Sequence, residues 1–155
     1  FVPDSALVGV EGNGWQQVTS ELGYERSGPE RFLSTFRVFL ELVRLVGRSP
    51  TGDQAAAVGR LASHLLSLRR MSLSVAGMLQ EGKMPNVEAA LVKDLGNRFE
   101  KLSLEIARLA APIDRDRQAF DQVLADSLLL SPSFSLRGGT SEILRGMIAR
   151  GLGLR

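Results

Sequence analysis

A glutamate and an arginine stand side by side just before a glycine–proline pair, and these residue types could support acid–base chemistry. Glu25 and Arg26 close a mostly apolar stretch, and Gly28-Pro29 follows shortly afterwards. Apolar neighbours disfavour the charged form of a carboxylate, and such a group can serve as a general base. The alternative is an ordinary exposed Glu–Arg pair on a helix surface, and the spacing alone favours this alternative.

A second candidate segment lies near the other end of the sequence, where two glycines precede a helical pattern. In Gly138-Gly139-Thr140 the glycines allow the backbone to come close to a ligand, and Thr140 can cap the following helix. The free N–H groups at such a helix start favour an anion. An ordinary glycine-led helix cap explains the same residues, so the motif by itself leaves both interpretations open.

Other catalytic patterns are weak or absent from the sequence. His64 is the only histidine, and its position in a helical pattern favours a packed or surface imidazole. There is no cysteine, and no carboxylate is paired with a histidine at helical spacing, so we expect neither thiolate chemistry nor a metal site. The glycine-rich residues 9–14 are not followed by the Gly-Lys-Ser/Thr of a phosphate-binding loop.

Composition narrows the class of protein further. The 155 residues are 44% apolar and carry 19 basic against 17 acidic side chains, which fits one globular domain and excludes a disordered chain. The longest apolar runs fall far short of the roughly 20 residues that a membrane span needs. No signal peptide is visible, so we expect a soluble, cytoplasmic protein. The arginines are scattered without interleaved aromatic residues, so we do not expect nucleic-acid binding.

Helices must position the two candidate segments. Apolar residues recur at spacings of three and four, and proline and glycine mark the breaks. The pattern predicts helices over 15–46 with an interruption at Gly28-Pro29, over 58–79, 87–109, 117–130 and 140–152, with a loop at 132–139. We therefore predict an all-α fold, an antiparallel four-helix-type bundle with a short C-terminal helix, preceded by a short strand and loop remnant in residues 1–14.

Several motifs occur together and in a fixed order along the chain. They are Val2-Pro3-Asp4, Gly12-Asn13-Gly14-Trp15, Leu22-Gly23-Tyr24-Glu25-Arg26, the stretch 88–93, and a closing signature of residues 138–144 followed by Ile148-Ala149-Arg150. In this order they resemble the C-terminal part of the acyl-CoA dehydrogenases. The resemblance implies that residues 1–14 end a middle β-domain and its linker, that residues 15–155 form the C-terminal helical-bundle domain, and that the sequence is a fragment of a longer enzyme.

The resemblance also implies an activity, the α,β-dehydrogenation of an acyl-CoA thioester to the 2-enoyl-CoA. In this family a glutamate removes the α-proton while the β-hydrogen leaves as hydride to FAD. Most members carry that glutamate at the position of Gly138, and a subset carries it at the position of Glu25. The resemblance therefore assigns the catalytic base to Glu25, contacts with substrate to Tyr24, Arg26 and Gly139, and contacts with FAD to Thr140, Ser141 and Glu142.

Two departures from the family concern its FAD contacts between subunits. Residues 47–52 lack the usual Phe-Gly, and residues 111–115 replace the usual Gln-x-x-Gly-Gly-x-Gly. The resemblance implies a homo- or hetero-oligomer formed through the bundle and an electron-accepting flavoprotein as partner. One alternative is a non-catalytic helical interaction or oligomerisation module, for example one subunit of a heteromeric dehydrogenase. Another is an FAD-binding relative with oxidase or nitroalkane activity.

Overall fold

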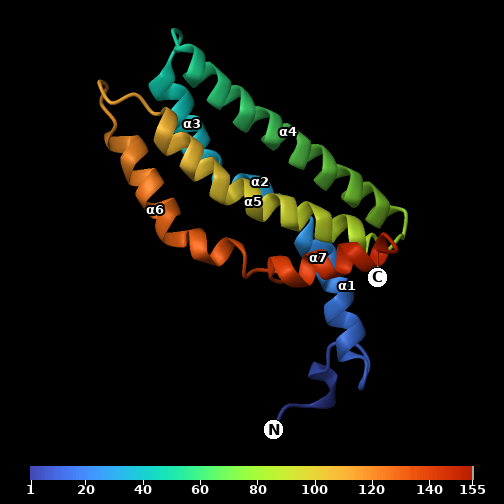
Figure 1. Ribbon diagram of the computed structural model, residues 1–155. Coiled ribbons are helices and arrows are strands. Elements are labelled where there is room, and N and C mark those ends of the chain that lie inside the picture. Colours follow the sequence, from blue (N-terminus) through green and yellow to red (C-terminus); the bar gives the residue numbers. More distant parts are fainter. Residues whose placement is uncertain (155) are drawn as a thin grey trace.

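The chain folds into helices, as the computed structural model of residues 1–154 shows (Figure 1). The elements are η1 (Asp4–Ala6), a turn of 3-10 helix, and the seven α-helices α1 (Gly14–Arg26), α2 (Glu30–Leu33), α3 (Phe36–Val46), α4 (Gly52–Gln80), α5 (Asn86–Ala110), α6 (Gln118–Phe134) and α7 (Ser141–Gly151). No β-strand occurs in these 154 residues. The predicted all-α fold is confirmed.

Four helices, α3 to α6, form the body of the molecule, and successive helices alternate in direction (Figure 1). Helix α5 contacts every other α-helix, and the short α7 packs against it. The inward faces enclose the main core, which includes Val38, Leu42, Val46, Leu61, Leu65, Leu68, Phe99, Leu104, Phe120, Leu124 and Phe134. Burying a large apolar side chain of this kind stabilises the fold by about 1.5–3 kcal/mol. This arrangement confirms the predicted antiparallel bundle with a short C-terminal helix.

The first predicted helix is broken twice. The break predicted at Gly28-Pro29 is confirmed, because α1 ends at Arg26 and α2 begins at Glu30. A second break, after α2, was not predicted from the sequence; it lies beside Thr35, whose buried hydroxyl accepts a hydrogen bond of 2.9 Å from Ser103 on α5. Helix α2 is consequently a single turn that can lie close against α5.

The loop predicted at 132–139 begins later than expected, so this prediction is wrong for its first three residues. Helix α6 continues through Pro132 to Phe134. The Phe134 ring is buried in the core, and its carbonyl accepts a hydrogen bond of 3.0 Å from the Lys93 ammonium. These contacts hold the last turn of α6 in place although Pro132 contributes no N–H to it.

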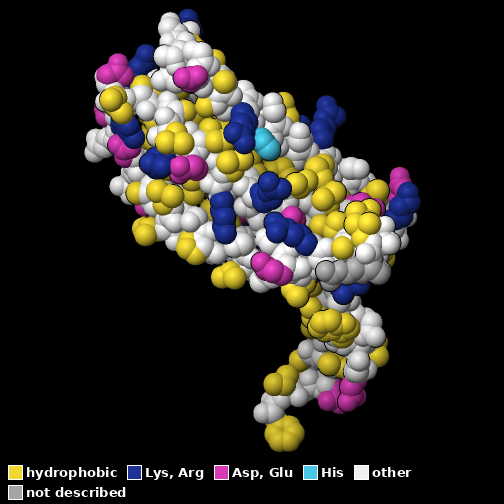
Figure 2. Space-filling view, viewed as in Figure 1, with side chains coloured by type: hydrophobic (Ala, Val, Ile, Leu, Met, Phe, Trp, Pro, Cys, Tyr) yellow, Lys and Arg dark blue, Asp and Glu magenta, His cyan; other side chains and the backbone are white. Residues whose placement is uncertain are grey.

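The strand predicted in the N-terminal residues is also wrong. Residues 1–13 project from the bundle as an exposed segment (Figures 1 and 2), and their only regular structure is the turn η1. A strand needs a neighbouring strand to pair its backbone groups, and the described chain offers none. A hydrogen bond of 3.0 Å from the Gln17 side-chain amide to the Val8 carbonyl ties the segment back to α1.

Among residues 1–154, no helix combines the length and the apolar character that crossing a membrane requires.

A glycine on α5 allows α2 to approach, and this contact predicts a substitution effect. A Cβ built on Gly96 would lie 2.8 Å from the Arg31 Cβ and 3.0 Å from the Arg31 carbonyl oxygen, whereas a Cβ on Gly59 of α4 would meet nothing. We expect Gly96→Ala to lower the free energy of unfolding by about 1–3 kcal/mol through overpacking. We expect Gly59→Ala to raise it by about 0.5–1 kcal/mol, because alanine is the better helix former. Urea unfolding of both variants measures this, and equal effects would contradict the close approach.

Candidate functional site

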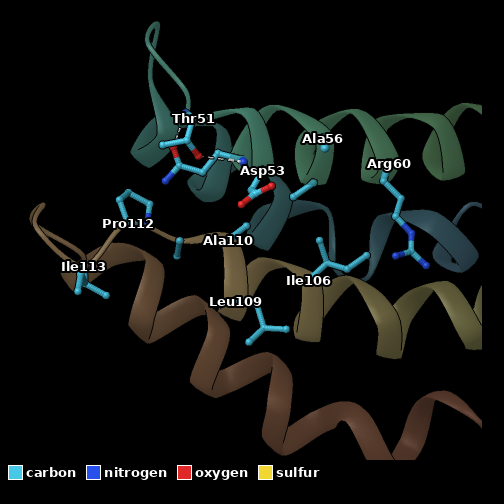
Figure 3. A pocket seen from close by; sticks show the side chains of 12 residues that line it. Thr51, Asp53, Ala56, Arg60, Ile106, Leu109, Ala110, Pro112 and Ile113 are labelled. Carbon is cyan, nitrogen blue, oxygen red and sulfur yellow. Dashed lines mark hydrogen bonds between the residues drawn. The ribbon is translucent and has the colours of Figure 1, made fainter.

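One candidate site is a groove of about 570 Å³ between the start of α4 and the end of α5 (Figure 3). Its wall is mostly apolar, with Asp53 and Arg60 among its few charged side chains. It is bordered by Thr51 and by residues 111–113. None of the sequence-predicted site residues lines this groove.

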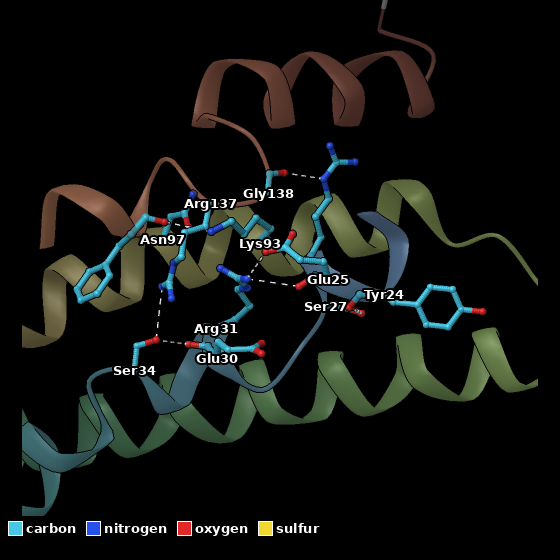
Figure 4. Close-up of polar contacts among 12 residues, drawn as sticks. Tyr24, Glu25, Ser27, Glu30, Arg31, Ser34, Lys93, Asn97, Arg137 and Gly138 are labelled. Carbon is cyan, nitrogen blue, oxygen red and sulfur yellow. Dashed lines mark hydrogen bonds and ion pairs between the residues drawn. The ribbon is translucent and has the colours of Figure 1, made fainter. Parts of the chain in front are cut away.

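The predicted site residues meet at the opposite end of the bundle, where α1 ends beside the loop between α6 and α7 (Figure 4). The Arg26 guanidinium donates a hydrogen bond of 2.8 Å from Nε to the Gly138 carbonyl. A Cβ built on Gly138 would overlap the Glu25 carboxylate, chiefly Oε2. Two segments that are distant in the sequence therefore form one site, and the Glu25 carboxylate fills the space that a side chain at residue 138 would need.

The backbone of this loop also favours glycine. Gly138 has φ +65° and Gly139 has φ +112°, both in the left-handed region that other residues rarely adopt. The turn directs the Gly138 carbonyl toward Arg26 and leads into the first turn of α7. Both glycines are therefore required by conformation, and Gly138 is required by space as well.

The Glu25 carboxylate is bound asymmetrically. Oε1 accepts a hydrogen bond of 2.7 Å from Arg31 Nη2, while Oε2 is shielded from solvent and has no hydrogen-bond partner in the protein. The side chain as a whole remains 36% exposed. The apolar surroundings considered from the sequence are thus not what the structure has, because a buried guanidinium contacts this carboxylate.

The other predicted site residues differ in exposure. Tyr24 is exposed and its ring points away from Glu25 (Figure 4). Arg26 is buried, and this burial lowers the pKa of its guanidinium, while the adjacent Glu25 carboxylate opposes the shift. Thr140 and Ser141 at the start of α7 are half-buried, and Glu142 is exposed. The site therefore has a buried cationic side and an accessible side.

A network of buried charges behind Glu25 was missed from the sequence. Lys93 and Glu100 on α5 are fully buried; the Lys93 ammonium donates to Asn97 Oδ1 at 2.7 Å, and Glu100 pairs with Arg137 at 2.6 Å. A signal existed, because Lys93, Asn97 and Glu100 recur at helical spacing on one face of α5. Such a polar stripe is usually solvated, so only the packing of the other helices reveals it.

Burial dominates the titration of this network. The pKa of the Lys93 ammonium is lowered to about 8, chiefly by burial and also by the Arg31 charge, while the Glu100 carboxylate opposes the shift. Burial raises the pKa of the Glu100 carboxyl, and the Arg137 guanidinium opposes this shift. Each charged group is held by a specific partner, because an unpaired charge in this environment would be costly.

His64 takes no part in the contacts of this site. His64 is exposed on α4, and its ring stacks on the buried Phe99 with centroids 6.0 Å apart, in agreement with the packed or surface imidazole expected from the sequence. Residues 1–154 contain no cluster of three His, Cys, Asp or Glu side chains that could hold a metal ion.

Neither the comparison with protein-family models nor the comparison with curated proteins finds a match to this chain.

The contact between Glu25 and Gly138 predicts an energetic coupling. We expect Gly138→Ala to destabilise the fold by about 1–2 kcal/mol from its left-handed backbone alone. The overlap with the carboxylate adds to this loss, and Glu25→Ala should relieve the overlap, giving a coupling energy of about 1 kcal/mol or more in a double-mutant cycle. Gly139→Ala is the control, since a Cβ there would be 3.7 Å from Arg26 and Leu144 and does not meet Glu25. Additive effects of Gly138→Ala and Glu25→Ala in urea unfolding would contradict the contact.

The buried lysine predicts a pH dependence of stability. Lys93 titrates at about 8 in the folded protein, below its ordinary value of 10.5, so between these pH values the unfolded chain binds the extra proton. The free energy of unfolding should therefore rise as the pH increases from 8 to 10.5, and fall again as the pH drops through 8. Urea unfolding across this range should show that Lys93→Met removes the rise and that Lys101→Met, at an exposed lysine, keeps it. An identical pH dependence of Lys93→Met and the unsubstituted protein would contradict the buried titration.

Proposed function

We propose that this chain is the helical C-terminal domain of an FAD-dependent acyl-CoA dehydrogenase, which converts an acyl-CoA thioester to the 2-enoyl-CoA. The observation that supports this most directly is the contact between Glu25 and Gly138. The family resemblance gives these positions as the two alternatives for the base. Here the carboxylate of the one fills the space beside the other, where a side chain would be excluded.

In this proposal Glu25 is the base that removes the α-proton. The α C–H bond breaks, an O–H bond forms on the carboxylate, and the electron pair remains on the thioester as an enolate. One feature supports this role: the Glu25 side chain is 36% exposed, so that a substrate can approach it. A positioned carboxylate is an ordinary general base for such a step.

In the same proposal, Tyr24, Arg26 and Gly139 bind the acyl-CoA. The exposed Tyr24 ring points away from Glu25, so it can line only a part of the substrate that lies away from the α-carbon. Arg26 donates a hydrogen bond from Nε to the Gly138 carbonyl and lies beside Gly139. Its main role in the proposal is therefore to hold the loop that the thioester would approach. Such positioning raises the rate by holding the reacting atoms in a productive geometry.

The residues assigned to FAD fit a group that accepts hydrogen bonds. The backbone N–H groups in the first turn of α7 have no carbonyl partner in the helix, and the Thr140 side chain accepts no capping hydrogen bond. The Glu142 carboxyl has a pKa below its usual value, because its own backbone N–H and then the Thr140 hydroxyl stabilise its charged form. That negative charge makes this helix start better suited to a neutral part of FAD than to its phosphates. FAD, when bound, supplies the acceptor for the β-hydride, which no side chain can provide.

An oligomer formed through the bundle, with an electron-accepting flavoprotein as partner, belongs to the same proposal. Exposed leucines support a subunit contact, namely Leu66 and Leu73 on α4 and Leu129 and Leu130 on α6. The same leucines also favour the second candidate function, a non-catalytic helical interaction module. Flavin content and turnover separate the two functions.

The test of the proposed function uses the purified protein that contains this chain. We expect a yellow protein that reduces an electron acceptor with an acyl-CoA, and we expect Glu25→Gln to lower kcat by about 10²–10⁴-fold, the usual contribution of a general base. Flavin absorbance should be retained, because Glu25 is not among the residues assigned to FAD. Glu21→Gln, an exposed glutamate on the same helix, is the matched control and should leave kcat unchanged.

A protein without flavin, or one without acyl-CoA turnover, would contradict the dehydrogenase proposal and favour the interaction module. Unchanged turnover in Glu25→Gln would contradict the assignment of the base.

A further inference from the structure

Arg31 is a buried cation with one ionic partner. It lies on the single turn α2, is 2% exposed, and packs with its backbone against Gly96. Its only ion pair among residues 1–154 is with Glu25. No motif in the sequence marks this arginine. It reaches Glu25 because the chain turns at Gly28-Pro29 and returns beneath α1.

One nitrogen of Arg31 contacts both the backbone and the side chain of Glu25. Nη2 donates to the Glu25 carbonyl at 3.4 Å and to Glu25 Oε1 at 2.7 Å (Figure 4). A donor shared in this way fixes the carboxylate relative to its own backbone, which a long flexible side chain would not achieve alone. The orientation of Glu25 therefore depends on Arg31.

The two oxygens of the Glu25 carboxylate have different surroundings, and Oε2 is shielded from solvent. Oε1 is held by Arg31, and Oε2 lies against Gly138 without a hydrogen-bond donor. The other buried cations are committed elsewhere, since Lys93 donates to Asn97 and to the Phe134 carbonyl and Arg137 pairs with Glu100. Arg26 donates its Nε to Gly138 and makes no hydrogen bond to the carboxylate. Among residues 1–154, Arg31 is therefore the one cation that donates a hydrogen bond to the Glu25 carboxylate.

We propose that Arg31 is a positioning residue for the base, holding the Glu25 carboxylate in the orientation in which it receives the α-proton. The inference rests on the proposed function. In the proton transfer the α C–H bond breaks, the proton bonds to the Glu25 carboxylate, and the electron pair stays on the substrate as the thioester enolate. Arg31 keeps Oε1 throughout and does not contact the substrate.

The test measures kcat and KM for acyl-CoA oxidation in the complete protein, together with exchange of the substrate α-proton in deuterium oxide. We expect Arg31→Met to lower kcat and the exchange rate by about 100-fold, because a misplacement of the base by about 1 Å has an effect of this size. KM should change little, since Arg31 makes no contact with substrate. Arg31→Lys keeps the charge but lacks the planar guanidinium, so we expect an intermediate loss of about 10-fold.

Arg117→Met is the matched control, because Arg117 pairs with Asp121 on the distant α6 and should leave kcat and exchange unchanged. If Arg31→Met does not fold, Arg31→Lys decides alone. Values of kcat and exchange within twofold of the unsubstituted protein, or a rise in KM without a fall in kcat, would overturn the role of Arg31. Absence of acyl-CoA oxidation in the unsubstituted protein would instead overturn the proposed function, so the two failures are distinguishable.

Discussion

The close contact between the Glu25 carboxylate and the Gly138 backbone is the constraint on which the arrangement of this end of the molecule depends. It requires α1 to end at a fixed distance from the loop between α6 and α7, and it requires a residue without a side chain at position 138. The bond from Arg26 to the Gly138 carbonyl closes the contact from one side, and the pair between Arg31 and Glu25 closes it from the other. The bundle therefore acts as a rigid support that presents one carboxylate beside one turn.

Buried charges, more than apolar contacts, fix the loop that carries this turn. Lys93 holds the last carbonyl of α6, and Glu100 holds Arg137 immediately before the two glycines. Replacing a buried ion pair by apolar residues is often neutral or stabilising, so such pairs are poor evidence for stability. What they supply here is a defined position, because each cation donates to a specific partner on another helix or loop. The cost in desolvation is visible in the displaced pKa values of Lys93 and Glu100.

The sequence predicted the helices well and the buried polar residues badly, for related reasons. Apolar spacing and the pair Gly28-Pro29 identified the bundle and its first break, since both signals are local. The second break beside Thr35 and the extension of α6 to Phe134 depend on contacts with α5, which no local pattern encodes. The resemblance gave Glu25 and Gly138 as the two alternative positions of the base, and no local pattern in the sequence brought them together. Spacing alone favoured an exposed pair with Arg26, whereas the partner in the structure is Arg31, which the turn brings back beneath α1.

The short connection between α1 and α2 has a consequence for changes in chain length. Its backbone is closed by bonds from the Gly28 N–H to the Glu25 carbonyl and from the Arg31 N–H to the Gly28 carbonyl, and the Ser72 hydroxyl of α4 donates to the Ser27 carbonyl at 2.6 Å. Surface connections usually absorb insertions and deletions. This one cannot, because a single added or removed residue would break these hydrogen bonds and displace α2, and the guanidinium would no longer reach its carboxylate. The length of the connector thus fixes the position of Arg31 relative to Glu25, and natural variants of this protein should conserve that length more strictly than the residues of the connector.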